Sequence, residues 1–169
     1  MRITTILLTA AVGLLIGCSG SPADQHLDIV FDVCAPIAVV APDATLEQRA
    51  GIERGVDLWR DRGVTTLSLD AAIDAPSVEI QFDDAAANFH GIYEDEIGVI
   101  FVNRDLTDLD ALGVTVAHEL GHAFGLWHVD VAERLSVMNP GNLSITPTDG
   151  DQLALTEVWG SCSPAEATR

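Results

Sequence analysis

Apolar and polar residues recur along the chain with the periods of helices and strands. An apolar stripe with helical spacing predicts a first helix over residues 45–61. Its members are Ile52, Val56 and Trp59. Thr45 and Gln48 stand in the positions of a capping box at its start, and Gly63 follows as a stop signal.

Strand-like segments precede and follow this helix. Residues 78–82 alternate between apolar and polar, as a half-buried strand does, whereas residues 99–102 form the continuous apolar run of a more enclosed strand. Residues 83–96 between them are predicted to be an acidic loop. Three further segments have the composition of extended chain, namely residues 27–33, 37–40 and 64–69.

Two more helices complete the pattern. One begins at Thr107 or Asp108 and runs through an apolar stripe to Phe124. The last begins at the cap residues of segment 146–149 and ends near Trp159. The length of 169 residues and the apolar fraction of 48% fit one domain with a sizeable core.

The N-terminus has the pattern of an export signal. Arg2 is the only charged residue before an apolar run over residues 3–16, which predicts a signal peptide over residues 1–17 rather than a buried helix. The segment Leu15-Ile16-Gly17-Cys18 resembles the lipobox of bacterial lipoproteins. The resemblance implies that Cys18 is lipidated, that residues 18–26 form a tether, and that Ser19 directs the protein to the outer membrane, on its periplasmic or surface face.

The charge narrows the range of partners. The formal net charge is −18, and all eight basic residues are arginine. Such a field repels nucleic acid and anionic lipid, so we expect no nucleic-acid partner and membrane attachment only through the lipid. We expect a monomer whose acidic surface serves mainly for solvation.

The motif with the clearest chemistry lies on the second predicted helix. The segment from His118 to His128 reads HELGHAFGLWH. Histidines four residues apart on a helix share one face, and Gly125 permits a turn that brings His128 to the same metal ion. Three nitrogen ligands leave one tetrahedral position open, as in catalytic zinc sites, and Glu119 lies beside them.

This extended motif resembles that of the metzincin zinc endopeptidases. Ser136-Val137-Met138-Asn139-Pro140 is similar to their Met-turn, so Met138 would form an apolar base under the metal. Segments 55–59 and 156–160 look like the start helix and final helix of matrixins, and the similarity covers most of residues 45–160. It implies an α+β zincin domain over residues 27–169, with a twisted mixed sheet, three main helices and a cleft along the sheet edge.

The resemblance also implies a function. Peptide bonds would be hydrolysed by zinc-activated water, with Glu119 as general base and His118, His122 and His128 as ligands. The alternative is a non-catalytic peptide-binding or zinc-binding lipoprotein on the same fold. Peptide or protein substrates would pair with an exposed strand, for which Gly98, Val99, Ile100 and Phe101 are the candidates, although an internal strand fits their apolar run equally. His90 and Tyr93 are candidates for the rim of the cleft, although ordinary surface or core positions fit them better.

Some positions depart from the family pattern. Val129 follows the third histidine, where matrixins have a serine. In astacins and serralysins a tyrosine after the methionine can approach the zinc, but here Asn139-Pro140 follows Met138, so no such tyrosine is expected. Only His26 and His90 remain outside the motif, so a second, structural zinc site is not expected. The acidic segments 83–84 and 94–96 are a weaker candidate for calcium than for a solvated loop.

Two cysteines remain after Cys18 is assigned. In an oxidising compartment, Cys34 and Cys162 are expected to form one disulfide that ties the two ends of the domain together. The alternative is that Cys34 acts as an inhibitory thiolate on the zinc. The segment Val33-Cys34-Ala35-Pro36 lacks the switch motif of matrixins, which favours the disulfide.

Overall fold

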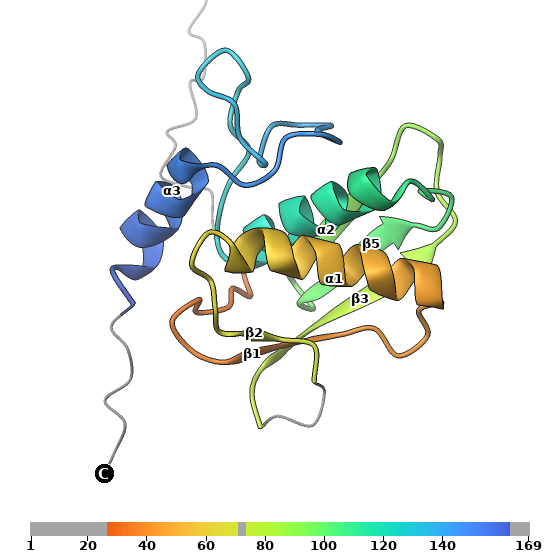
Figure 1. The fold of residues 1–169 in the computed structure, drawn as a ribbon, viewed down its shortest axis with the longest axis horizontal. Helices are drawn as coiled ribbons and strands as arrows, with labels where there is room; N and C mark the ends of the chain where they lie inside the picture. The colour runs from red at the N-terminus through yellow and green to blue at the C-terminus, as the bar shows by residue number, and fades with distance from the viewer. Residues whose placement is uncertain (1–26, 71–73, 163–169) are drawn as a thin grey trace, which may run out of the picture.

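The computed structural model describes residues 27–70 and 74–162. The predicted signal peptide, the lipidation site Cys18, the tether and His26 lie outside the described residues. The described chain is α+β, with a five-stranded mixed sheet and three helices (Figure 1), as predicted. No helix within those ranges is long and apolar enough to cross a membrane.

The sheet has the strand order β2-β1-β3-β5-β4. Neighbouring strands are parallel except β4, which is antiparallel to β5. The strands are β1 (Ile37–Val40), β2 (Leu67–Ser68), β3 (Ser77–Asp83), β4 (Gly91–Glu94) and β5 (Val99–Asn103). The two edges are therefore the short strands β2 and β4.

The prediction that Gly98, Val99, Ile100 and Phe101 form the substrate edge is wrong. β5 lies between β3 and β4 and pairs with both. Ile100 is completely buried and Val102 is 1% exposed, which is the environment that a continuous apolar run favours. The edge strand is β4, which lies within the segment predicted to be an acidic loop.

The strand predicted over residues 27–33 is also absent. Its side chains do alternate between buried and exposed positions, with Phe31 and Val33 in the core. Its backbone, however, bonds to isolated carbonyls rather than to a strand: Ile29 N donates to Asp95 O and Phe31 N to Ala123 O. The alternation therefore reflects burial against the ends of other elements, and not a sheet ladder.

The helices lie close to their predicted bounds. They are α1 (Leu46–Arg60), α2 (Leu109–Ala123) and α3 (Asp149–Trp159), and α1 has the predicted capping box between Thr45 and Gln48. α1 and α2 lie side by side (Figure 1). A Cβ atom on Gly51 or Gly55 would overlap Leu112 or Val116 of α2, so glycine permits the close approach of the two helices.

Two further contacts join segments of the domain that are distant in sequence. The indole Nε1 of the fully buried Trp59 on α1 donates to Ala117 O of α2 at 2.7 Å. Cys34, before β1, and Cys162, after α3, have their sulfur atoms 2.06 Å apart in a disulfide, which leaves no Cys34 thiolate for a metal.

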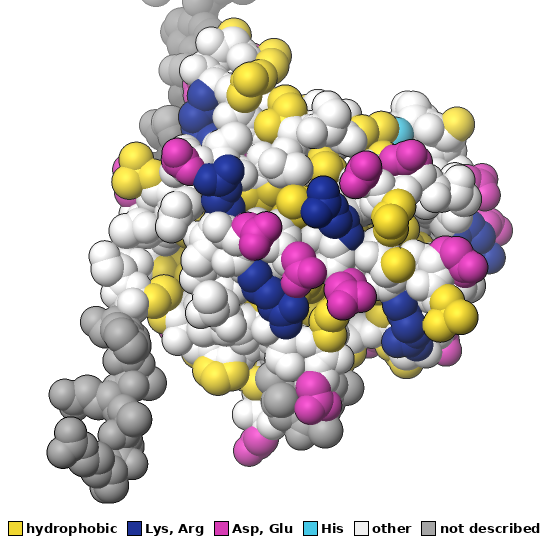
Figure 2. All heavy atoms as spheres, viewed as in Figure 1, with side chains coloured by type: hydrophobic (Ala, Val, Ile, Leu, Met, Phe, Trp, Pro, Cys, Tyr) yellow, Lys and Arg dark blue, Asp and Glu magenta, His cyan; other side chains and the backbone are white. Residues whose placement is uncertain are grey.

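On the face formed by α1, arginine and acidic side chains are interspersed (Figure 2).

Candidate metal centre

Helix α2 positions the first two histidines and the glutamate. Asp108 caps its start by accepting a hydrogen bond from Ala111 N at 2.9 Å. The last two turns carry His118, Glu119 and His122, which line one cavity. His118 and Glu119 are only 7% and 5% exposed, so both polar side chains are held within the protein rather than on a solvated helix face.

A glycine turn ends α2 and redirects the chain. Gly125 has a φ of 91°, a left-handed conformation that glycine adopts without steric cost. Its N–H donates to His122 O at 2.8 Å, and Leu126 N donates to Gly121 O at 2.9 Å. This pair of bonds is a Schellman motif, and it returns the chain so that His128 faces the histidines of the helix.

The three imidazoles meet at their Nε2 atoms. His128 Nε2 lies 3.1 Å from His118 Nε2 and 3.2 Å from His122 Nε2. The opposite nitrogens face backbone carbonyls: His118 Nδ1 lies 2.7 Å from Val137 O and His122 Nδ1 lies 2.8 Å from Leu126 O. Because a carbonyl only accepts, both Nδ1 atoms carry the proton, and in the neutral rings both Nε2 atoms have a free lone pair.

This arrangement fits a metal ion. His128 can donate at most one Nε2 proton, so converging lone pairs would repel each other unless a cation lay between them. Zn–N bonds of about 2.0–2.1 Å in a tetrahedral site place ligand nitrogens about 3.3 Å apart, near the observed separations. Among the described residues, these three histidines are the one group of His, Cys, Asp or Glu placed to hold a metal ion.

The pKa values favour the metal-binding form. Burial lowers the pKa of His118, and the neighbouring His128 lowers it further, outweighing the bond to Val137. Burial, together with His118 and His128, lowers the pKa of His122 to about 4. Burial also lowers the pKa of His128. Neutral imidazole is the form that binds metals, so no proton needs to be displaced at neutral pH.

Glu119 is buried beside the ligands. Burial raises the pKa of its carboxyl group to about 8, and a hydrogen bond from the backbone amide of Tyr93 partly offsets that effect. β4 passes directly over it, because a Cβ atom on Gly91 would lie 3.0 Å from both Cγ and Oε1 of Glu119. The edge strand therefore fixes the carboxyl group in the cavity.

Met138 lies beneath the site. It is completely buried, and a Cβ atom on Gly121 would overlap its sulfur. Glycine at position 121 therefore permits Met138 to approach α2 closely. Met138 O accepts from Val129 N at 3.1 Å, directly after the third histidine. The loop that contains Met138 thus contacts both the helix and the segment that carries His128.

The cavity has a volume of about 410 Å³ and follows β4. His90 and Tyr93, the candidates for the rim, are among its lining residues, together with residues from the loop after Met138, including Asn142. Tyr93 is only 7% exposed, and its hydroxyl donates to Ile29 O at 2.7 Å, so it acts as a wall rather than a mobile side chain.

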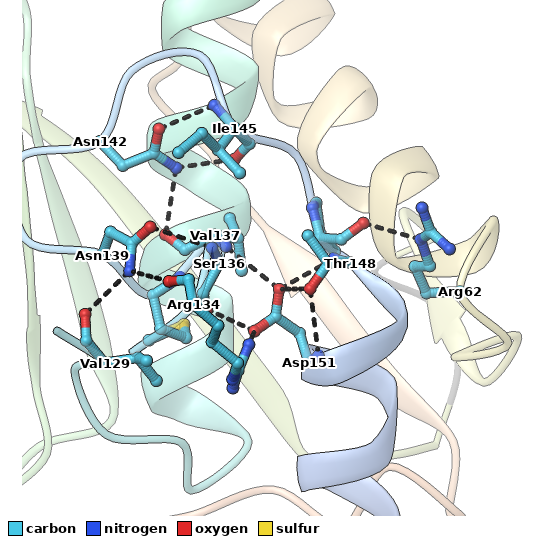
Figure 3. Close-up of polar contacts among 12 residues, drawn as sticks. Arg62, Val129, Arg134, Ser136, Val137, Asn139, Asn142, Ile145, Thr148 and Asp151 are labelled. Atoms are coloured by element: carbon cyan, nitrogen blue, oxygen red, sulfur yellow. Dashed lines mark hydrogen bonds and ion pairs between the residues drawn. The ribbon is translucent and has the colours of Figure 1, made fainter. Parts of the chain in front are cut away.

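Sequence reasoning missed two parts of this site. One is β4, which forms the wall of the cavity. The other is a polar network under the Met138 loop, in which Ser136 and Asp151 are fully buried and hydrogen-bonded to each other (Figure 3). Asp151 lies in a helix start where acids are common for electrostatic reasons, so no sequence signal distinguished it.

The acidic segments considered for calcium have other contacts. Asp84 lies 3.1 Å from the guanidinium of Arg104, and Asp83 lies 3.8 Å from it. Asp95 accepts from the backbone N of Asp28 at 2.8 Å. These carboxylates therefore take part in separate surface contacts.

No protein-family model matches the chain, and no curated protein matches its sequence. Function is therefore inferred from the residues of the site itself.

Proposed function

We propose that this protein is a zinc-dependent endopeptidase of the metzincin type, with Glu119 as its general base. The observation that supports it most is the convergence of three Nε2 atoms beside one buried carboxyl group. The three nitrogens leave a tetrahedral ion one open position, as hydrolytic zinc sites do. A purely structural zinc would take a fourth protein ligand, and no further histidine or cysteine joins the group of described residues.

His118, His122 and His128 would hold the ion. A bound zinc ion supplies Lewis acidity, which lowers the pKa of water and polarises a carbonyl group. The charge of a cation held by the histidines would favour the ionised form of the Glu119 carboxyl group, against the effect of burial. The Glu119 carboxylate then accepts the proton of the attacking water and delivers it to the leaving amine. Because β4 lies directly over Glu119, the carboxyl group is held in a fixed position in the cavity.

Substrate would bind in extended form along β4. Among the described residues β4 pairs with no strand other than β5, and it lines the cavity that contains the histidines. Apart from the Tyr93 amide, which bonds to Glu119, its outer edge would receive a peptide backbone. β4 therefore takes the role predicted for residues 98–101. Met138 would serve as the apolar base of the site.

The proposed location is outside the cytoplasm. The lipobox-like segment supports an exported lipoprotein anchored through Cys18 in the outer membrane, and the disulfide between Cys34 and Cys162 fits an oxidising compartment. We propose a monomer that acts on peptides or proteins. The net charge of −18 argues against nucleic acid as a partner.

The test is cleavage of a mixed peptide library by the purified mature domain. We expect cleavage that a chelator abolishes and added zinc restores, and a loss of about 100-fold or more in Glu119→Gln with zinc stoichiometry unchanged. Chelator-insensitive cleavage, or equal rates for the variant, would refute the mechanism. Zinc and peptide binding by both proteins without any cleavage would instead support the non-catalytic binder.

A further inference from the structure

A buried carboxylate anchors the loop beneath the candidate metal centre. Asp151, in the first turn of α3, is completely buried. Its two oxygens accept hydrogen bonds from Ser136 Oγ, Arg134 Nη1, Val137 N, Thr148 N and Thr148 Oγ1 (Figure 3). Donors surround both oxygens, so the group is stabilised as an anion in the interior.

One of these bonds continues toward the histidines. The Ser136 hydroxyl donates to Asp151 Oδ1, and its oxygen accepts from Met138 N at 2.9 Å. The Met138 N–H belongs to the same peptide group as the Val137 carbonyl. That carbonyl accepts the proton of His118 Nδ1 at 2.7 Å. All donors therefore point the same way, from the imidazole of His118 to the carboxylate of Asp151.

We propose that Ser136 and Asp151 are positioning residues for the metal: they relay the carboxylate charge through the Val137–Met138 peptide to His118. Each bond in a chain of donors with one direction polarises the next. A more polarised Val137 carbonyl holds the proton on Nδ1 and increases the electron density at Nε2 of His118, the nitrogen that faces the metal. The relay rests on the metal-binding part of the proposed function and does not depend on the reaction.

The relay differs from simple structural support in one respect that can be measured. Thr148 Oγ1 also donates to Asp151, at 2.9 Å, but it lies outside the chain of bonds that leads to His118. Loss of either hydroxyl removes one hydrogen bond from the same buried carboxylate. Only loss of the Ser136 hydroxyl interrupts the path to the imidazole.

The experiment compares Ser136→Ala with Thr148→Ala in the zinc-free and zinc-loaded protein. Thermal unfolding of the zinc-free proteins measures the structural cost of each change. Competition with a chelating dye measures the zinc Kd, and the visible spectrum of the Co²⁺-loaded protein reports the ligand field. We expect Ser136→Ala to weaken zinc binding about 10-fold and to shift the Co²⁺ spectrum, as loss of outer-shell partners does. Thr148→Ala should leave both unchanged.

A second pair of variants covers the case in which Ser136→Ala does not fold. Asp151→Asn keeps the shape of the side chain but removes its charge, and we expect it to weaken zinc binding in the same way. Asp149→Asn is the control, because this acid of the same helix turn is exposed and pairs with Arg62. Equal zinc affinities within both pairs would overturn the relay alone. Failure of the wild type to bind zinc would overturn the proposed function and the relay together.

Discussion

Asp151 combines two opposing influences on one carboxyl group. Burial raises its pKa, but hydrogen bonds from Ser136, Arg134, Thr148 and Val137 outweigh burial, so the pKa lies below its usual value. The folded protein therefore stabilises the ionised form. The cost of burying the charge is offset by hydrogen-bond donors from two separate segments, residues 134–137 and Thr148.

This lowered pKa predicts a loss of stability in acid. Between the unfolded pKa, about 3.9, and the lower folded pKa, the unfolded chain binds more protons than the native one. The contribution of Asp151 is therefore complete above about pH 3.9 and is lost as the pH falls through the folded pKa. Denaturant unfolding at a series of pH values should show a shallower acid loss for Asp151→Asn than for the wild type.

The matched control for this titration is again Asp149→Asn. It removes one carboxylate from the same turn of α3 without touching the buried network. Its stability should fall in acid as steeply as that of the wild type. Equal slopes for the wild type and Asp151→Asn would show that hydrogen bonds to this carboxylate do not control the acid transition.

At the scale of elements, local signals predicted more than long-range ones. The three helices and the metal motif follow from spacing within a few turns, and the turn at Gly125 follows from the conformational freedom of glycine. The order of strands depends on pairing between distant segments, which residue periodicity does not record. β4 has four residues and is followed directly by Asp95 and Glu96, so its sequence resembles a loop although the strand forms the cavity wall.

The polar network under Met138 was unpredictable for the same reason. Ser136 and Asp151 lie in separate segments, and only the folding of α3 against the loop brings their side chains together. A serine two residues before Met138 and an aspartate in a helix start each have an ordinary local explanation. Their joint burial is a property of the packed elements and not of either segment.

The contact between β4 and α2 gives a prediction for Gly91→Ala. The new methyl group would lie 3.0 Å from Cγ and Oε1 of Glu119 and from Cγ2 of Thr115, closer than ordinary contacts. Either the carboxyl group or the edge strand must shift, and small misplacements of a general base cost up to about 100-fold in rate. We expect peptide turnover to fall by about 10-fold or more while zinc stoichiometry is retained.

The measurement is kcat/KM for one library-derived peptide, with bound zinc determined in the same samples. Retained zinc would separate an effect on Glu119 from loss of the metal, because the three histidines come from α2 and the following turn rather than from β4. Unchanged turnover in Gly91→Ala would mean that the position of Glu119 under β4 is not needed for the reaction.

At the scale of the whole molecule, the ends of the described chain are joined across the fold. The segment before β1 contacts the C-terminal end of α2 through Phe31, and the disulfide links that segment to the residue that follows α3 by three positions. α3 carries Asp151, so the buried network at its start holds it to the Met138 loop, and the disulfide just after its end holds it to the segment before β1.

The sequence separation of 128 residues between Cys34 and Cys162 predicts a large effect of the disulfide on stability. Closing a loop of this length restricts the unfolded chain, and removing a native disulfide typically costs about 2–5 kcal/mol. We expect Cys34→Ser with Cys162→Ser to lower the free energy of unfolding by that amount. Zinc binding should survive below the new transition, because the ligands lie on α2 and its C-terminal turn. Reductant should destabilise the wild type by a similar amount and leave the double variant unaffected. A wild type whose stability does not change with reductant, or cysteine thiols that can be labelled without reductant, would contradict the disulfide.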